Sequence, residues 1–259
     1  MVTSSRVLLR GVAVAYDLVG DGVPVVVLHG WGAQAAAVRP IVDCLQDRWQ
    51  VCAPDLPGFG ASMAPPVAWS VRDYAEVVQA LMERLGMSTA HIIGHSFGGR
   101  VGIVLASESP TIVQQLVLVN SAGVKQPERL KDRLQAAAMR GGRLVLGAAG
   151  RPAEGRWRDR LRSWAAERFR SDDYRSAGQL RPTFLRVVNE DLRSRLPAIQ
   201  APTLLIWGDQ DQETPLVEGR LMAEAIPDAR LEVFAGAGHY SYLDQPAEFC
   251  DLVCSFLRS

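Results

Sequence analysis

The chain of 259 residues lacks several features that would assign it to a class of protein at once. It contains no run of about eighteen consecutive apolar residues, so no membrane-spanning helix is expected. Residues 1–22 alternate as a strand does and lack the continuous apolar block of a signal peptide, which favours the cytoplasm. The chain also lacks a charge excess, because 28 Lys and Arg balance 28 Asp and Glu. Nucleic acid is therefore not an expected partner.

Cysteine is scarce as well. The four cysteines form no CxxC pair and no cluster with histidine, so they predict no metal site. Four are too few for a disulfide framework in a chain of this length. We interpret all four, Cys44, Cys52, Cys250 and Cys254, as reduced packing residues. The last two lie four residues apart on a predicted helix, where a shared buried face explains both.

The sequence does have a regular alternation of short apolar runs and helical patterns, and 48% of its residues are hydrophobic. Continuous runs of this kind suit parallel strands that are buried on both faces. Between them, residues 70–85 form the clearest helical pattern, with a capping box of Ser70 and Asp73 at its start and Gly86 at its end. We therefore predict an α/β fold with a doubly wound sheet, whose ligands bind beyond the carboxyl ends of the strands. The six apolar runs are 23–29, 49–55, 90–96, 115–121, 202–209 and 230–236.

The alternation stops near residue 121 and resumes near residue 199. We predict a core domain from residues 1–120 and 198–259, and an inserted helical cap over 121–197. The cap carries 16 Arg and 2 Lys against 9 Asp plus Glu, a net charge of +9 that the rest of the chain balances with −9. Arginines of this kind usually form a solvated face. The alternative is a functional role, in which a cationic cap above a cleft attracts an anionic small-molecule substrate or an anionic lipid surface.

A short motif between a predicted strand and a predicted helix supplies a candidate nucleophile. The segment GHSFGG at 94–99 places Ser96 on a tight turn, with glycines two residues to either side. Such a turn exposes the serine hydroxyl, and glycines avoid the collisions that Cβ atoms would cause there. Ser96 is therefore the candidate nucleophile.

A serine hydroxyl is a weak nucleophile and needs a base that a third group orients. His239 lies in the loop GAGHY after the predicted strand 230–236, and Asp211 lies in the loop after the strand 202–209. The other histidines, His29, His91 and His95, belong to strands or to their ends and suit this role less well. Asp209 and Glu213 compete with Asp211 for the role of the acid.

Acyl transfer also needs preorganised donors for the oxyanion of the tetrahedral intermediate. The backbone N–H groups of Trp31, in HGWG at 29–32, and of Phe97, directly after the serine, occupy the expected places.

These segments together resemble the α/β-hydrolase superfamily along nearly the whole chain. HGWG is similar to its oxyanion loop, DLPGFGAS at 55–62 to its glycine-rich turn, and GHSFGG to its nucleophile elbow. GDQDQETP at 208–215 is similar to its acid loop, and GAGH at 236–239 to its histidine loop. The resemblance implies an α/β-hydrolase fold and catalysis by Ser96, Asp211 and His239 without metal or cofactor.

The family pattern also bears on the choice of acid and on the branch. Glycine, two residues, an acid, three residues and a proline select Asp211 over its neighbours. The alternative acid position of some relatives holds Asn120, which is not an acid. A serine at the elbow argues against the dehalogenase and epoxide-hydrolase branches, which have an aspartate there.

The leading function from the sequence is hydrolysis of a small to medium carboxylic ester, lactone or thioester through an acyl-enzyme, by a monomer or homodimer. A C–C bond hydrolase of ring-cleavage diketones ranks lower, because the tryptophan that we associate with that branch is absent after His239. An acyltransferase remains an alternative. A small-molecule receptor built on a hydrolase is the alternative outside the enzymes.

Overall fold

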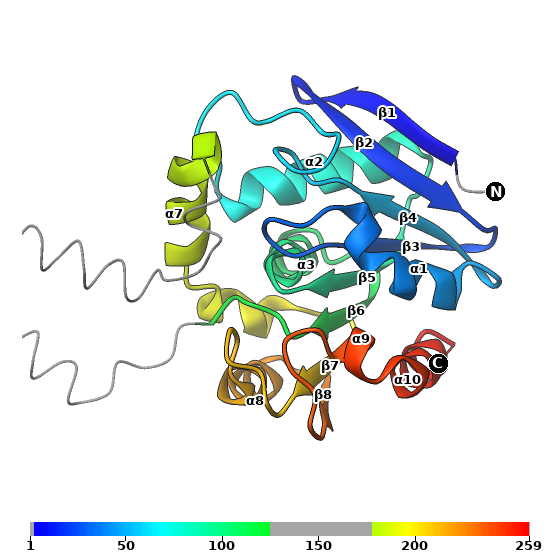
Figure 1. The fold of residues 1–259 in the computed structure, drawn as a ribbon, viewed down its shortest axis with the longest axis vertical. Coiled ribbons are helices and arrows are strands. Elements are labelled where there is room, and N and C mark those ends of the chain that lie inside the picture. The colour runs from blue at the N-terminus through cyan, green and yellow to red at the C-terminus, as the bar shows by residue number, and fades with distance from the viewer. Residues whose placement is uncertain (1–2, 125–177, 259) are drawn as a thin grey trace, which may run out of the picture. The chain divides into compact units, whose positions relative to one another are not determined.

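The computed structural model describes residues 3–124 and 178–258, and its centre is an eight-stranded sheet (Figure 1). The strand order is β1-β2-β4-β3-β5-β6-β7-β8. The first two strands form an antiparallel hairpin, β2 runs antiparallel to β4, and all later pairs are parallel. The predicted α/β-hydrolase fold with a mostly parallel sheet is confirmed. The strands are β1 (Thr3–Leu9), β2 (Val12–Val19), β3 (Val23–Leu28), β4 (Trp49–Pro54), β5 (Ala90–His95), β6 (Val113–Val119), β7 (Thr203–Gly208) and β8 (Ala229–Phe234).

Helices cover both faces of this sheet. Figure 1 shows α2, α3 and α8 on one side and α1 and α10 on the other. No helix of the described residues is long and apolar enough to cross a membrane. The α-helices are α1 (Arg39–Leu45), α2 (Val71–Arg84), α3 (Phe97–Glu108), α7 (Arg181–Asn189), α8 (Leu216–Ala225), α9 (Ser241–Asp244) and α10 (Pro246–Phe256). The 3-10 helices are η1 (Ala35–Val38), η3 (Gly178–Leu180) and η4 (Arg193–Ala198).

The apolar runs of the sequence become strands that are buried on both faces. Along β6, Leu116 and Leu118 belong to the core layer under α2 and α3, while Val117 and Val119 belong to the layer under α1 and α10. Successive side chains of a strand point to opposite faces, so an unbroken apolar run fills both layers. This alternation explains why β3 to β7 read as continuous hydrophobic segments.

The helix predicted over 70–85 is α2, and its start and end follow the sequence signals. The backbone N–H and the hydroxyl of Ser70 both donate to Asp73 Oδ2, at 2.7 and 2.6 Å. Gly86 follows the helix with φ 74°, a conformation that glycine adopts without strain.

The predicted cap, residues 121–197, falls largely on residues 125–177, which lie outside the described part of the chain. Its last part is described, as η3, α7 and η4. Val187, Leu192 and Leu196 from this part join the core layer under α2 and α3. This segment therefore packs with the core elements.

The interpretation of all four cysteines as reduced is wrong for two of them. Cys44 on α1 and Cys250 on α10 form a disulfide across 206 residues, with their Cα atoms 5.7 Å apart, while Cys52 and Cys254 are free thiols. Helices α1 and α10 pack against each other on the same face of the sheet. Sequence spacing cannot reveal such a pair, because only the packing of these helices brings the two residues together.

Candidate active site

Ser96 lies between the last residue of β5 and the first residue of α3, in a strained turn. Its backbone has φ 51° and ψ −109°, an unfavourable region for a residue with a side chain. A Cβ atom at Gly94 would collide with the backbone of Gly98, and one at Gly98 would collide with the backbone of Leu28. Only glycine allows the chain to turn this tightly beside β3. The predicted elbow motif thus has a direct steric reason.

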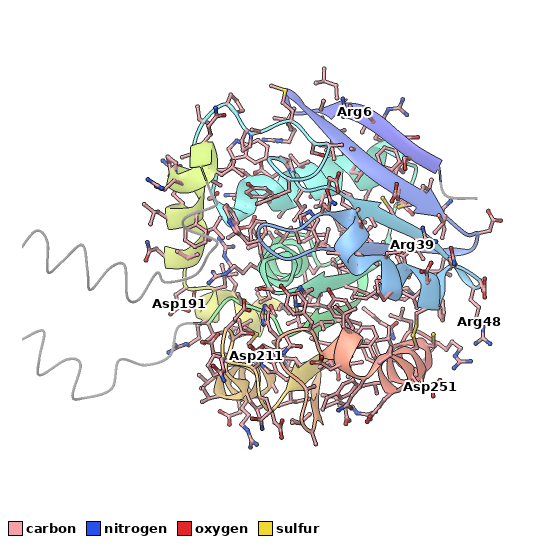
Figure 2. The ribbon with its side chains drawn as sticks, viewed as in Figure 1. Arg6, Arg39, Arg48, Asp191, Asp211 and Asp251 are labelled. Atoms are coloured by element: carbon pink, nitrogen blue, oxygen red, sulfur yellow. A yellow bond between two sulfur atoms is a disulfide. The ribbon has the colours of Figure 1, made fainter. Side chains whose placement is uncertain are left out.

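Asp211 lies in the loop after β7 and is held by five hydrogen bonds. Its Oδ1 accepts the backbone N–H groups of Glu213 (2.9 Å) and Thr214 (3.0 Å). Its Oδ2 accepts Asn120 Nδ2 (2.7 Å), the Thr214 hydroxyl (2.7 Å) and His239 Nδ1 (2.9 Å). The side chain is fully buried, and Figure 2 shows it in the body of the molecule.

These hydrogen bonds set the ionisation of the carboxyl group. Burial raises the pKa of Asp211, but the hydrogen bond and charge of His239, together with the hydrogen bonds of Thr214, outweigh burial and lower this pKa to about 2. Asp211 is therefore an ionised acceptor at neutral pH. An acceptor at Nδ1 requires that this nitrogen of His239 carries the proton, which leaves Nε2 with a free lone pair in the neutral ring.

His239 follows β8 in the loop that also carries Gly238, and it is 8% exposed. Its Nε2 lies 3.4 Å from Oε2 of Glu213, a residue that the sequence treated only as a competitor for the acid role. Among the described residues, the Ser96 hydroxyl makes no hydrogen bond to His239. The structure thus brings Asp211 and His239 into contact, whereas the position of Ser96 is set by the tight turn between β5 and α3.

Two further histidines at this end of the sheet are neutral and structural. Leu56 N–H donates to His29 Nε2 (2.9 Å), so the Nδ1–H of His29 donates to Gly30 O (2.7 Å). His95 Nε2 donates to the backbone oxygen of His239 (2.9 Å). Burial lowers the pKa of His29 to about 4 and that of His95 to about 3. Neither ring is available as a base, although His95 supports the loop of His239.

The two predicted oxyanion residues lie on either side of the elbow. Phe97 is the first residue of α3, where backbone N–H groups have no partner within the helix. The HGWG loop passes beside the serine, because a Cβ atom on Gly30 would lie 3.5 Å from Ser96 Cβ. The rings of Trp31 and Phe97 also touch, with centroids 5.2 Å apart.

Asn120, at the end of β6, is a member of the site that sequence reasoning missed. It was treated as an unfilled acid position, but its buried side chain donates to Asp211 Oδ2 and accepts the Ser241 hydroxyl at 2.6 Å. Its φ of 44° is a conformation that asparagine tolerates better than most residues. An asparagine directly after a buried strand was the available signal. Thr214, a polar residue three positions after Asp211, was a second signal of this kind.

No group of three or more His, Cys, Asp or Glu side chains is arranged to hold a metal ion within residues 3–124 and 178–258.

A family model described as the alpha/beta hydrolase fold matches residues 23–246. The chain belongs to the α/β-hydrolase family. The match extends from β3 into α10 and so includes the elbow, the acid loop and the histidine loop. The resemblance inferred from the motifs is confirmed at the level of the family.

Known proteins that are similar to this chain act on different bonds. It is 31% identical to the 2-hydroxymuconate semialdehyde hydrolase of Pseudomonas sp. strain CF600, over 92% of this chain and 88% of that protein. It is 29% identical to the pimeloyl-[acyl-carrier protein] methyl ester esterase of Chromobacterium violaceum, over 94% of this chain and 97% of that protein. The solved structure of a hydrolase from Pseudomonas aeruginosa PA01 has 28% identity and a TM-score of 0.76, covering 99% of this chain and 98% of that one.

Proposed function

We propose that this protein is a serine hydrolase that cleaves a small to medium carboxylic ester, lactone or thioester through an acyl-enzyme on Ser96. The observation that carries the proposal is the bond between His239 Nδ1 and the ionised, buried Asp211. This bond leaves the Nε2 lone pair free to take a proton. A serine on a strained elbow and a base oriented by a carboxylate are the parts that acyl transfer requires.

The reaction proceeds in two halves. Ser96 Oγ attacks the carbonyl carbon while its proton passes to His239 Nε2, and the charge that develops on the ring is stabilised by Asp211. The tetrahedral intermediate then expels the alcohol, which takes the proton from Nε2, and the acyl group stays on Ser96. Water repeats both steps: it gives a proton to Nε2, attacks the acyl carbon and releases the acid and the free serine.

The backbone N–H groups of Trp31 and Phe97 stabilise the oxyanion in both halves. The support for this role is the position of Phe97 at the N-terminus of α3 and of the HGWG loop beside Ser96. Donors that are fixed before the reaction act without reorganisation when the charge develops.

C–C bond hydrolysis is a second candidate, favoured by the 31% identity to the 2-hydroxymuconate semialdehyde hydrolase. Two features of this chain support the ester reaction instead. The residue after His239 is Tyr240, not tryptophan. The Glu213 carboxylate beside His239 would repel a substrate that carries a carboxylate, as a derivative of muconate does.

The test is a series of p-nitrophenyl esters from acetyl to long acyl chains, with initial rates for the wild type, Ser96→Ala and Ser107→Ala. Ser107 lies on the same helix, and among the residues that the structure describes its hydroxyl bonds only to Val104 O, so its loss is a matched control. We expect Ser96→Ala to lower turnover by about 10⁴-fold or more and Ser107→Ala to leave it nearly unchanged. Hydrolysis of 2-hydroxymuconate semialdehyde without turnover of any ester would replace the ester proposal by the C–C reaction.

A further inference from the structure

The ring of His239 lies between two carboxylates that come from one loop. Asp211 Oδ2 is 2.9 Å from Nδ1, and Glu213 Oε2 is 3.4 Å from Nε2. The Asp211 side chain is fully buried, whereas that of Glu213 is 61% exposed. The second carboxylate therefore faces both the base and the solvent from which a substrate arrives.

The position of Glu213 follows from the fold of the acid loop. Its backbone N–H donates to Asp211 Oδ1, and the next residue, Thr214, donates to the same carboxylate through its N–H and its hydroxyl. These bonds tie the backbone of Glu213 to the acid that orients the base. The backbone of Glu213 thus fixes where its side chain begins relative to His239, although the carboxylate itself is exposed to solvent.

The charge of Glu213 is not neutralised by an Arg or Lys side chain in the described part of the chain. Its one close charged-group contact there is with His239 Nε2, which becomes an ion pair only when that nitrogen takes a proton. Glu232 on β8 differs in this respect, since it pairs with Arg230. A carboxylate beside the base that has no Arg or Lys partner in residues 3–124 and 178–258 is a feature to which a substrate responds.

We propose that Glu213 is a specificity-determining residue that favours esters with a positively charged leaving alcohol over neutral or anionic ones. The inference rests on the proposed function, in which Nε2 hands a proton to the leaving oxygen. Since Glu213 lies beside Nε2, the departing alcohol passes within several ångströms of its carboxylate. At about 6 to 8 Å in a partly hydrated site, one unit charge changes the preference for another by about two- to tenfold.

This inference and the arginine-rich cap point to opposite charges on the substrate. Most of the cap arginines lie in residues 125–177, outside the described residues, so the anionic preference stays a prediction. Glu213 is the described charge nearest the base nitrogen that faces the leaving group. A comparison of a cationic with a neutral leaving alcohol decides between the two expectations, because they predict opposite preferences.

The experiment compares a choline ester with the 3,3-dimethylbutyl ester of the same acid, which has the same shape without the charge. The quantity is the ratio of their kcat/KM values in the wild type, Glu213→Gln and Glu232→Gln. We expect a ratio of about two to ten in the wild type, about one in Glu213→Gln and the wild-type value in Glu232→Gln. The wild-type ratio should also fall towards one as salt is raised, because the site is open to solvent.

A ratio that is the same in the wild type and in Glu213→Gln would overturn the inference, as would a wild-type preference for the neutral ester that survives the substitution. If Glu213→Gln turns over neither ester, the same ratio is measured as binding affinity in Ser96→Ala and in Ser96→Ala with Glu213→Gln, and an unchanged ratio again overturns the inference. Failure of the proposed function looks different, because the wild type would then hydrolyse neither the choline ester nor its neutral analogue.

Discussion

Asp211 and Glu213 are two carboxylates on one loop, in contact with opposite nitrogens of one histidine, yet their surroundings differ in every other respect. Asp211 is fully buried and accepts five hydrogen bonds. Glu213 is mostly exposed, and within the described part of the chain its carboxylate contacts only His239. The residue type is nearly the same at both positions, so the environment alone separates a carboxylate that is buried against His239 Nδ1 from one that is open to solvent beside Nε2.

The largest effect is expected from Asp211→Asn, which removes the charge of the buried carboxylate. An amide keeps the shape of the group but removes its charge, and its NH₂ can oppose the Nδ1–H of His239. We expect kcat on the best ester to fall by about 10³- to 10⁴-fold with little change in KM. Steady-state rates measure this, and retention of more than a tenth of the activity would show that another residue orients the base.

Asn120→Asp tests the same network by adding a second carboxylate 2.7 Å from Asp211 Oδ2. Two carboxylates this close must share a proton, so the pKa of the pair rises in the folded state above its unfolded value. A raised pKa stabilises the folded state at low pH, and this stabilisation is lost as the pH rises. We therefore expect the free energy of unfolding to fall by about 2 kcal/mol or more between pH 4 and pH 7 relative to the wild type.

Urea unfolding at several pH values measures this difference. The matched control is Asn189→Asp, a substitution at an exposed position on α7. A flat pH profile for Asn120→Asp would mean that the network relaxes to accept a second charge.

His95 is a further buried group at this site, and unlike the ionised Asp211 its ring stays neutral in the folded protein. Burial lowers its pKa to about 3 in the folded protein, while the unfolded chain binds a proton near pH 6.5. The unfolded state therefore gains protons first, and stability falls as the pH drops below about 6.5. The free energy of unfolding falls between pH 7 and pH 5, and His95→Gln should make this decrease smaller by about 2 kcal/mol. Unfolding curves at the two pH values measure it, and an unchanged pH dependence would contradict the assignment.

The smallest effect is expected from Glu213→Gln on neutral esters. An exposed side chain with one contact contributes little to folding, so the Tm should change by less than about 2 °C. On a neutral ester the lost carboxylate meets no charge on the substrate but no longer faces the positive charge that develops on His239. Because the side chain is mostly exposed, kcat/KM should fall by less than about tenfold. A loss of tenfold or more would place Glu213 in the chemical step and would remove the contrast with Asp211.

Much of the fold could be predicted because its signals are local. A strand that is buried on both faces is largely apolar along its length, and a capping box occupies four successive residues. Both β6 and the start of α2 can therefore be predicted from the sequence. The elbow is legible for the same reason, since the glycines that Ser96 needs are two residues away. Ser96, Asp211 and His239 as catalytic residues remain a prediction that rests on these motifs.

Only the tertiary structure decided which distant residues meet. Asn120 reaches Asp211 because β6 and β7 are parallel neighbours, and Cys44 reaches Cys250 because α1 and α10 pack together. Glu213 meets His239 because the loops after β7 and β8 lie at the same end of the sheet. Local preferences of the backbone act over a few residues, whereas these contacts depend on strand order and helix packing. Local sequence patterns thus specified the elements and the candidate motifs, and the packing of the sheet and its helices brought together the partners of each side chain.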